Sequence, residues 1–274
     1  MLEVRGLSVA YGPVKVLHGI DLDIGSGEIV ALIGPNGAGK TSTLNAIAGL
    51  LPHGGEVTLD GEALPPAAEE VVRRGLALVP QGRRVFPTMT VEENLLMGAY
   101  SKGARWKGFD DRVAPVYEIF PRLGERRRQE AGRLSGGEQQ MLVIGRALLS
   151  EPQIVLIDEL SLGLAPKMVL TLLETIQRFN AERGTACLLV EQAATAALKI
   201  ATSAYLLQRG NVVYHGSAAG GSGSPSSITS PPRGRRPAMA LRVEVLPAPL
   251  GPMRATISPS PMVRSIPWST LTGP

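Results

Sequence analysis

The sequence has little of several features that would define its class at once. Its 274 residues include a single cysteine, Cys187, so no internal disulfide can form, and the apolar setting of that residue (ACLLV) predicts a buried thiol. No stretch approaches the roughly 18 apolar, charge-free residues needed to span a bilayer, which excludes a channel. The start, MLEVRGLSVAYG, lacks a basic segment followed by an apolar one, so we expect no secretory leader. These absences favour a cytosolic protein.

Histidine is also scarce, and the three present, His18, His53 and His215, show no metal-ligand spacing. We expect them to be structural or solvated. The 44% hydrophobic content excludes a wholly disordered chain, and the length allows one or two domains with a buried core.

The net charge of +4 is unevenly distributed. From Ser217 onward there are six Arg, no Lys and one acidic residue, Glu244, so this segment carries +5. Removing these from the totals of 28 Lys+Arg and 24 Asp+Glu leaves 22 basic and 23 acidic residues in positions 1–216. The basic balance therefore gives no argument for a nucleic-acid partner, and we expect none.

Residues 217–274 hold 11 of the 22 prolines and are rich in Ser, a composition that predicts a disordered tail. Two interpretations stay open. The tail is either a flexible basic arm for an anionic partner or an unstructured appendage, including the product of a shifted reading frame.

Residues 1–216 alternate short apolar runs with helical stretches, which indicates an α/β fold. The strands we predict are 2–9, 16–24, 28–33, 154–157 and 187–190, with a hairpin near Gly210-Asn211. The segments TVEENLLMGAY and EQQMLVIGRALL carry apolar residues at helical spacing.

The strand at 28–33 leads into a glycine-rich loop that matches G-x-x-x-x-G-K-[ST] and precedes a helix. The loop consists of Gly34, Pro35, Asn36, Gly37, Ala38, Gly39, Lys40 and Thr41, with Ser42 next. Glycines let backbone N–H groups approach a phosphate, and the helix dipole adds positive potential. We expect Lys40 to neutralise the β- and γ-phosphates of a bound nucleotide and Thr41 to hold Mg²⁺.

A second acidic element follows the apolar run 154–157, where Asp158 and Glu159 end the predicted strand. Parallel sheets place their ligands at this end. Asp158 is the candidate Mg²⁺ residue, acting directly or through a water molecule. Glu159 is the candidate catalytic base, or the carboxylate that orients water for attack on the γ-phosphate.

Between these elements lies LSGGEQQ (134–140), followed by a helix. Ser135 and Glu138 have the spacing of a capping box, and Gly136 and Gly137 beneath the helix N-terminus form a further candidate phosphate surface. By itself the segment is equally compatible with a simple helix cap.

With LSGGEQQ between GPNGAGKT and LIDE, residues 1–216 resemble the ABC (ATP-binding cassette) ATPases. The resemblance implies a P-loop NTPase core with an antiparallel β subdomain and an α-helical subdomain at about 82–150. It implies that Tyr11 stacks on adenine and that Gln81 links the Mg²⁺ site to the helical subdomain. It also implies that Ser135, Gly136 and Gly137 complete the phosphate site of a second cassette.

The strings VPQGRRVFPTMTVEENLLMGA, SLGLAPKMV and LLVEQAATAAL resemble the smaller ATPase subunit of branched-chain amino acid importers. That resemblance implies an energy-coupling subunit on the cytoplasmic face of the inner membrane. Its implied partners are a second ATPase subunit, in a homodimer or heterodimer, integral-membrane permeases, and indirectly an extracytoplasmic binding protein. Arg83, Arg84 and Phe86 are the first candidates for contacting a permease. Importers of urea and short amides stay an alternative.

Three positions depart from the common cassette pattern. Leu160 stands where proline usually follows the catalytic glutamate, so we expect Glu159 to be less rigidly held and turnover to be reduced. Gln192 occupies the place of a γ-phosphate-contacting histidine; it can donate a hydrogen bond but cannot carry a positive charge. Ala165 replaces an aspartate that crosses the dimer interface in many cassettes. A catalytically impaired regulatory cassette and a soluble cassette of translation or DNA repair are the rival interpretations.

Overall fold

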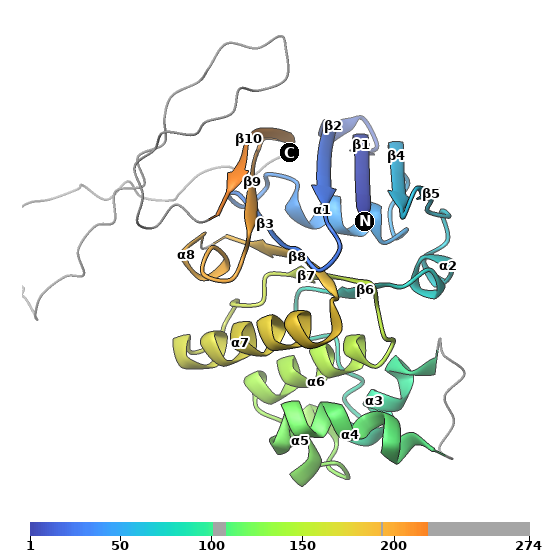
Figure 1. Ribbon diagram of the computed structural model, residues 1–274, viewed down its shortest axis with the longest axis vertical. Helices are drawn as coiled ribbons and strands as arrows, with labels where there is room; N and C mark the ends of the chain where they lie inside the picture. The colour runs from blue at the N-terminus through green and yellow to red at the C-terminus, as the bar shows by residue number, and fades with distance from the viewer. Residues whose placement is uncertain (101–107, 193, 219–274) are drawn as a thin grey trace, which may run out of the picture. The chain divides into compact units, whose positions relative to one another are not determined.

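The computed structural model describes residues 1–100, 108–192 and 194–218, all of which belong to one compact unit, Met1–Pro231. Figure 1 shows two sheets and a group of helices in this unit. The prediction of a disordered tail at 217–274 concerns residues that, from 219 onward, lie outside the described part of the chain.

The N-terminal strands form a four-stranded antiparallel sheet in the order β2-β1-β4-β5. Its members are β1 (Leu2–Tyr11), β2 (Val14–Ile24), β4 (Gly54–Leu59) and β5 (Glu62–Ala63). The two predicted N-terminal strands are confirmed and run two residues further into the turn, because Tyr11 pairs with Val14 across Gly12 and Pro13. Gly12 has φ +57°, a left-handed conformation that glycine adopts without penalty.

The second sheet has six strands in the order β10-β9-β3-β8-β7-β6. Its members are β3 (Ile29–Ile33), β6 (Leu76–Val79), β7 (Ile154–Asp158), β8 (Ala186–Glu191), β9 (Ser203–Gln208) and β10 (Asn211–Ser217). Neighbouring strands are parallel except for the β9–β10 hairpin, which is antiparallel. The strands predicted at 28–33, 154–157 and 187–190 and the hairpin near Gly210 are confirmed.

The central strands β7 and β8 are apolar up to the acidic residue that ends each of them, because both of their faces are buried. In β8, Cys187 and Leu189 belong to a core shared with the helices, whereas Leu188 and Val190 belong to a core shared with the antiparallel sheet. Residues of β7 alternate in the same way. The buried thiol predicted for Cys187 is confirmed, and burial raises its pKa to about 12.

The described helices fall into two groups. Those that flank the sheets are α1 (Lys40–Ile47), α2 (Ala68–Arg73), α7 (Pro166–Arg183) and α8 (Ala194–Ala197). Those that lie together at the opposite end from the antiparallel sheet in Figure 1 are α3 (Val91–Gly98), α4 (Phe109–Ile119), α5 (Pro121–Glu125) and α6 (Gly136–Leu148). The predicted helices at TVEENLLMGAY and EQQMLVIGRALL correspond to α3 and α6. In the described ranges, no helix has the length and hydropathy needed to cross a membrane.

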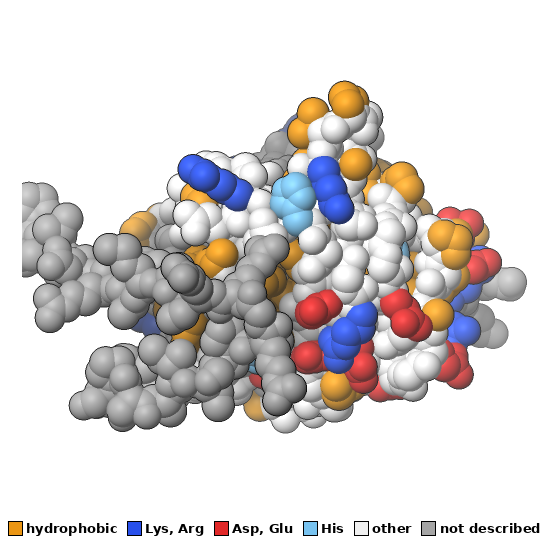
Figure 2. All heavy atoms as spheres, turned by 90° about the horizontal axis from the view of Figure 1, so that it is seen from above, with side chains coloured by type: hydrophobic (Ala, Val, Ile, Leu, Met, Phe, Trp, Pro, Cys, Tyr) orange, Lys and Arg blue, Asp and Glu red, His pale blue; other side chains and the backbone are white. Residues whose placement is uncertain are grey.

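Acidic and basic side chains are mixed on the surface of this unit. Figure 2 shows them lying beside one another on the face seen from above. Arg5, for example, pairs with Asp23 at 2.6 Å and with Glu3 at 3.2 Å. Such exposed pairs contribute little to stability, typically about 0–1 kcal/mol each.

Candidate nucleotide site

The glycine-rich loop connects the central strand β3 to α1, as the sequence pattern predicts. Gly39, at the N-cap of α1, has φ +106°. A Cβ at this position would lie 2.6 Å from Leu17 Cδ2, so a side chain would fit only if Leu17 moved. A Cβ on Gly34 would collide with the carbonyl oxygen of Leu207 on β9. The loop therefore presents backbone rather than side chains at the N-terminus of α1.

Lys40 is the first residue of α1, and its side chain is only 4% exposed. Its Nζ donates hydrogen bonds to the carbonyl oxygens of Gly34, at 2.9 Å, and Pro35, at 3.2 Å. The ammonium thus lies under the loop it belongs to. Thr43, on the next turn of the chain, donates from Oγ1 to the Gly39 carbonyl at 2.9 Å and ties the first turn of the helix to the loop.

Asp158 ends β7 and is 3% exposed. Burial raises the pKa of its carboxyl above the usual value, as does the nearby charge of Glu159. A hydrogen bond from Thr41 and the charge of Lys40 oppose that rise. Among the residues that the structure describes, the Oδ1 atom of Asp158 is buried and has no hydrogen-bond partner. A buried oxygen left unpaired beside a threonine hydroxyl is the donor set expected for a hard divalent cation.

Glu159 follows Asp158, and its carboxylate contacts the two other predicted site residues nearby. Oε1 lies 3.5 Å from Lys40 Nζ, and Oε2 accepts a 2.8 Å hydrogen bond from Gln81 Nε2. Gln81 follows β6 and therefore reaches the site from the neighbouring strand. The structure thus brings Lys40, Gln81, Asp158 and Glu159 together at the carboxyl ends of β3, β6 and β7.

Tyr11 lies at the end of β1 with 49% of its surface exposed. Its hydroxyl is 3.3 Å from Ser42 Oγ, in the first turn of α1. The antiparallel sheet therefore delivers an exposed aromatic ring to the side of the phosphate loop.

The LSGGEQQ segment forms the N-terminus of α6. Ser135 Oγ accepts from the Glu138 N–H at 3.4 Å, while the Glu138 carboxylate accepts from the Ser135 N–H at 2.9 Å, so the predicted capping box is confirmed. A Cβ on Gly136 would meet the Arg83 guanidinium at 2.5 Å, and one on Gly137 would meet Met168 at 2.9 Å. In the described residues, this segment makes no hydrogen bond to the phosphate loop of its own chain.

Gln192 directly follows β8 and is exposed. Its neighbour Glu191 is 1% exposed and was missed by the sequence analysis. Glu191 Oε1 accepts from the Ser161 N–H at 3.0 Å, and Oε2 accepts from Ser161 Oγ at 2.6 Å. The sequence does carry a signal for this residue: Glu191 follows the apolar run CLLV at the end of a predicted strand, just as Asp158 follows IVLI.

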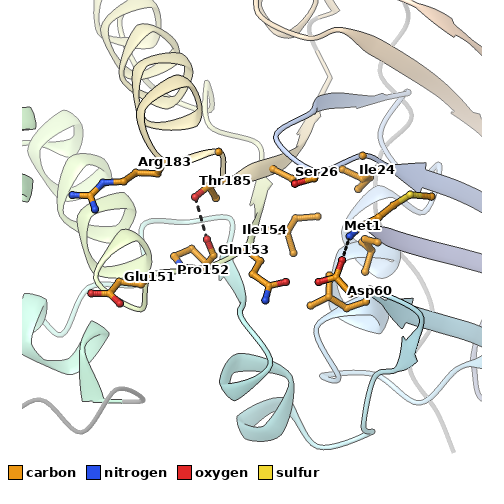
Figure 3. Close-up of a pocket in the computed structure, with 15 residues that line it drawn as sticks. Met1, Ile24, Ser26, Asp60, Glu151, Pro152, Gln153, Ile154, Arg183 and Thr185 are labelled. Carbon is orange, nitrogen blue, oxygen red and sulfur yellow. Dashed lines mark hydrogen bonds and ion pairs between the residues drawn. The ribbon is translucent and has the colours of Figure 1, made fainter.

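A separate cavity of about 390 Å³ lies at the amino-terminal ends of β7 and β8, away from the phosphate loop. Figure 3 shows Asp60, paired with the Met1 amino group, on one side and Arg183 on the other. Thr185 Oγ1 donates to the Pro152 carbonyl at 3.1 Å between them. None of the residues predicted for nucleotide chemistry lines this cavity.

A buried lysine at the start of a helix, a glycine loop after a parallel strand and a strand-ending Asp-Glu pair define a P-loop nucleotide-binding protein. The sequence matches the family of ABC transporters over residues 17–161. One relative is a high-affinity branched-chain amino acid transport ATP-binding protein, BraG, of Pseudomonas aeruginosa, 44% identical over 78% of this chain and 92% of that protein. Another is a probable branched-chain amino acid transport ATP-binding protein, LivF, of Archaeoglobus fulgidus, 36% identical over 80% and 92%.

Solved structures show the same fold. A dimeric ATP-binding cassette in a post-hydrolysis state with ADP and Pi is similar with a TM-score of 0.73, at 24% identity, over 80% of this chain and all of that one. An ATP-binding subunit of an ABC transporter has a TM-score of 0.70 at 32% identity, over 79% and 90%. The chain belongs to the ABC transporter family and is an ATPase, the ATP-binding subunit of a transporter.

Proposed function

We propose that this chain hydrolyses ATP to drive an importer of branched-chain amino acids. The observation that carries the proposal is the Glu159 carboxylate, held 3.5 Å from Lys40 Nζ at the edge of a phosphate loop. The 44% identity to BraG supports branched-chain amino acids as the cargo. The predicted phosphate loop is complete from Gly34 to Thr41.

ATP binding in this proposal begins with the phosphates. The N–H groups of Gly37, Gly39 and their neighbours cradle the β-phosphate, and Lys40 turns from the loop carbonyls to the β- and γ-phosphates. Tyr11 stacks on the adenine. Stacking of a base on an aromatic side chain contributes about 1–3 kcal/mol in complexes with single-stranded nucleic acids.

Thr41 and Asp158 fit a magnesium ion, since the unpaired Asp158 Oδ1 and the Thr41 hydroxyl are hard oxygen donors. Gln81 reaches the same edge of the sheet and carries an amide oxygen. Bound Mg²⁺ would offset negative charge on the transferring phosphoryl group.

Hydrolysis requires a water molecule aligned with the γ-phosphorus. Glu159 accepts a hydrogen bond from that water, orients it and receives its proton. Gln81 holds the other carboxylate oxygen through the 2.8 Å hydrogen bond from Nε2. Gln192, exposed at the end of β8, donates an amide hydrogen bond to the γ-phosphate.

A second cassette completes the site in this proposal. Ser135, Gly136 and Gly137 lie at the N-terminus of α6, where backbone N–H groups and the helix dipole favour an anion, and in this proposal they meet a nucleotide on another subunit. The dimeric cassette structure supports this assembly at the level of the fold. Closure would pass to membrane permeases through the segment after Gln81, where Arg84 and Phe86 are exposed. The chain would then act at the cytoplasmic face of the inner membrane, with an extracytoplasmic binding protein delivering the cargo.

The cargo is tested by uptake of labelled leucine and labelled urea in cells that lack this chain. We expect leucine uptake to be lost and to return with either the full chain or residues 1–218, while urea uptake stays unchanged. Leucine uptake that does not depend on the chain would contradict the proposed cargo, and loss of urea uptake would assign the alternative one.

The catalytic role is tested by Glu159→Gln, which keeps the size of the side chain and the contact with Gln81. We expect ATP hydrolysis to fall by about 100-fold or more while ATP still binds. Unchanged hydrolysis would instead support a regulatory cassette that binds ATP without using this carboxylate.

A further inference from the structure

The segment that carries Glu159 has an unusual backbone. Glu159 has φ +47°, in the left-handed region that a glutamate seldom adopts. Such a conformation persists only where the surroundings hold it. The contacts that stabilise this backbone conformation are therefore expected within the turn 159–161 and in the elements packed against that turn.

Strand β8 supplies those contacts. The Glu159 N–H donates to the Val190 carbonyl at 2.9 Å, which extends the β7–β8 pairing by one residue. The next carboxylate, that of Glu191, accepts from the Ser161 N–H at 3.0 Å and from Ser161 Oγ at 2.6 Å. Burial raises the pKa of the Glu191 carboxyl overall, whereas the Ser161 hydroxyl and N–H lower it, and the Leu160 backbone also contributes to lowering it.

Glu191 carries no ion pair within the described ranges, and no basic side chain contributes to its pKa. A carboxylate that is 1% exposed and lacks a cation is costly to bury unless several hydrogen-bond donors satisfy it. The donors here all come from the turn after Glu159. The cost of burying Glu191 is thus offset only when this turn has the conformation seen in the structure.

We propose that Glu191 is a positioning residue for ATP hydrolysis, whose buried carboxylate fixes the turn at Glu159–Ser161 and so keeps the Glu159 carboxylate beside Lys40. This proposal rests on the catalytic role proposed for Glu159. It assigns to a hydrogen-bonded carboxylate the rigidity that proline would supply at position 160. Leucine suits this arrangement, because it keeps a backbone N–H and places its side chain in the core at 1% exposure.

The principal test is Glu191→Gln in the full chain. Glutamine keeps the size of the side chain but replaces one acceptor oxygen by an NH₂ group, so the Ser161 N–H and hydroxyl can no longer both donate to it, and the hydroxyl must turn to accept from the amide. We expect kcat for ATP hydrolysis to fall by about 10- to 100-fold, as for small misplacements of a catalytic group, with KM within about twofold. Amide hydrogen exchange at residues 159–162 should quicken by about tenfold or more.

Ser161 gives a second pair of variants that are milder to the fold. Ser161→Ala removes one donor to Glu191, and Ser161→Thr keeps the hydroxyl. We expect Ser161→Ala to lower kcat and Ser161→Thr to restore it to within about twofold of the original. The double variant Glu191→Gln, Ser161→Ala should lose little more than Glu191→Gln alone, because both changes act through one contact.

The matched control is Glu28→Gln. Glu28 also accepts from one backbone N–H, that of Gly25 at 2.8 Å, and from hydroxyls, those of Ser203 at 2.6 Å and Thr202 at 3.2 Å, but it precedes β3 at the opposite end of the sheet. It should leave kcat and the exchange at 159–162 unchanged. Equal effects of the two Glu→Gln changes, or a Glu191→Gln chain with unchanged kcat and exchange, would overturn the proposal.

Glu159→Gln, measured in parallel, separates the two proposals. If it keeps full hydrolysis, the catalytic role of Glu159 fails, and the exchange measurement still decides whether Glu191 fixes the turn. If it loses hydrolysis while Glu191→Gln behaves as the original chain, only the role of Glu191 fails.

Discussion

At Gly39, backbone conformation and packing exclude a side chain for separate reasons. The residue has φ +106°, and a Cβ would lie 2.6 Å from Leu17 Cδ2. Gly61, in the turn between β4 and β5, shares a positive φ of +80° but has nothing within 4 Å of a Cβ. The two positions therefore separate the cost of the conformation from the cost of crowding.

We expect Gly39→Ala to lower the free energy of unfolding by about 2–4 kcal/mol, the sum of left-handed strain and overpacking. Gly61→Ala should cost only about 1 kcal/mol, for strain alone. Urea denaturation measures both, and nucleotide titration should show weaker ATP binding for Gly39→Ala only. Equal losses of stability would mean that Leu17 moves aside without cost.

At Leu160, the contacts argue against the expectation that leucine leaves Glu159 loosely held. Leu160→Pro would remove the Leu160 N–H, which contributes to lowering the pKa of Glu191. Proline also favours an extended backbone in the residue before it, which conflicts with the φ of +47° at Glu159. We expect this variant to hydrolyse ATP more slowly and to lose about 1–3 kcal/mol of stability. Steady-state hydrolysis and urea denaturation measure these effects. Faster turnover at unchanged stability would restore the expectation based on proline rigidity.

At the scale of elements, α3 and α6 both begin with a capping box. Thr90 caps α3 with Glu93 as its reciprocal partner, and Ser135 caps α6 with Glu138. The pair allows a structural role to be distinguished from a role in phosphate binding, because only α6 carries the glycines proposed to meet a nucleotide on a second cassette.

Replacing either N-cap residue by alanine should cost about 0.5–2 kcal/mol of stability. Hydrolysis should fall with Ser135→Ala and stay unchanged with Thr90→Ala, because only the first removes a proposed phosphate ligand. The measurements are chemical denaturation and ATP hydrolysis at saturating nucleotide. Equal hydrolysis by the two variants would reduce the LSGGEQQ segment to a helix cap.

Elements with one dominant local signal could be predicted from the sequence. Strands β7 and β8 are continuous apolar runs because alternate residues enter two different cores. Helix α7 was not identified, although Val169, Leu172, Leu173 and Ile176 repeat at helical spacing. The phosphate loop and the Asp158-Glu159 pair were identified, since each combines a residue pattern with a strand end.

Glu191 could not be assigned a role from the sequence, because its partner Ser161 lies 30 residues away and on another strand connection. An acidic residue at a strand end has many uses, and only the three-dimensional pairing of β7 with β8 shows which donors it meets. The contact of Gln81 with Glu159 likewise spans 78 residues and joins two separate strands. Local sequence patterns thus identified the candidate catalytic residues, and the order of the strands in the sheet determined which side chains contact them.

At the scale of the whole molecule, the last described strand ends close to the position where the sequence changes from a slightly acidic to a basic composition. Strand β10 ends at Ser217, which pairs with Ser203, and the Ala218 N–H donates to the Thr202 carbonyl at 2.9 Å. Residues 1–216 carry 22 basic and 23 acidic residues, and Ser217 and Ala218 add no charge. The net charge of +4 of the full chain therefore comes from the residues beyond 218.

Ending the chain after Ala218 should accordingly change its charge but not its stability or activity. The shortened chain keeps every hydrogen bond of β10 to β9, so its free energy of unfolding should match that of the full chain within about 0.5 kcal/mol. Its net charge becomes −1, so at pH 7 it should pass a cation exchanger that retains the full chain at low salt. ATP hydrolysis should be equal for the two, as measured at matched concentrations. A shortened chain that aggregates or loses ATP binding would show that residues beyond 218 belong to the folded cassette. Equal retention of the two chains on the exchanger would show that a basic surface of the cassette, rather than the tail, determines binding to the exchanger.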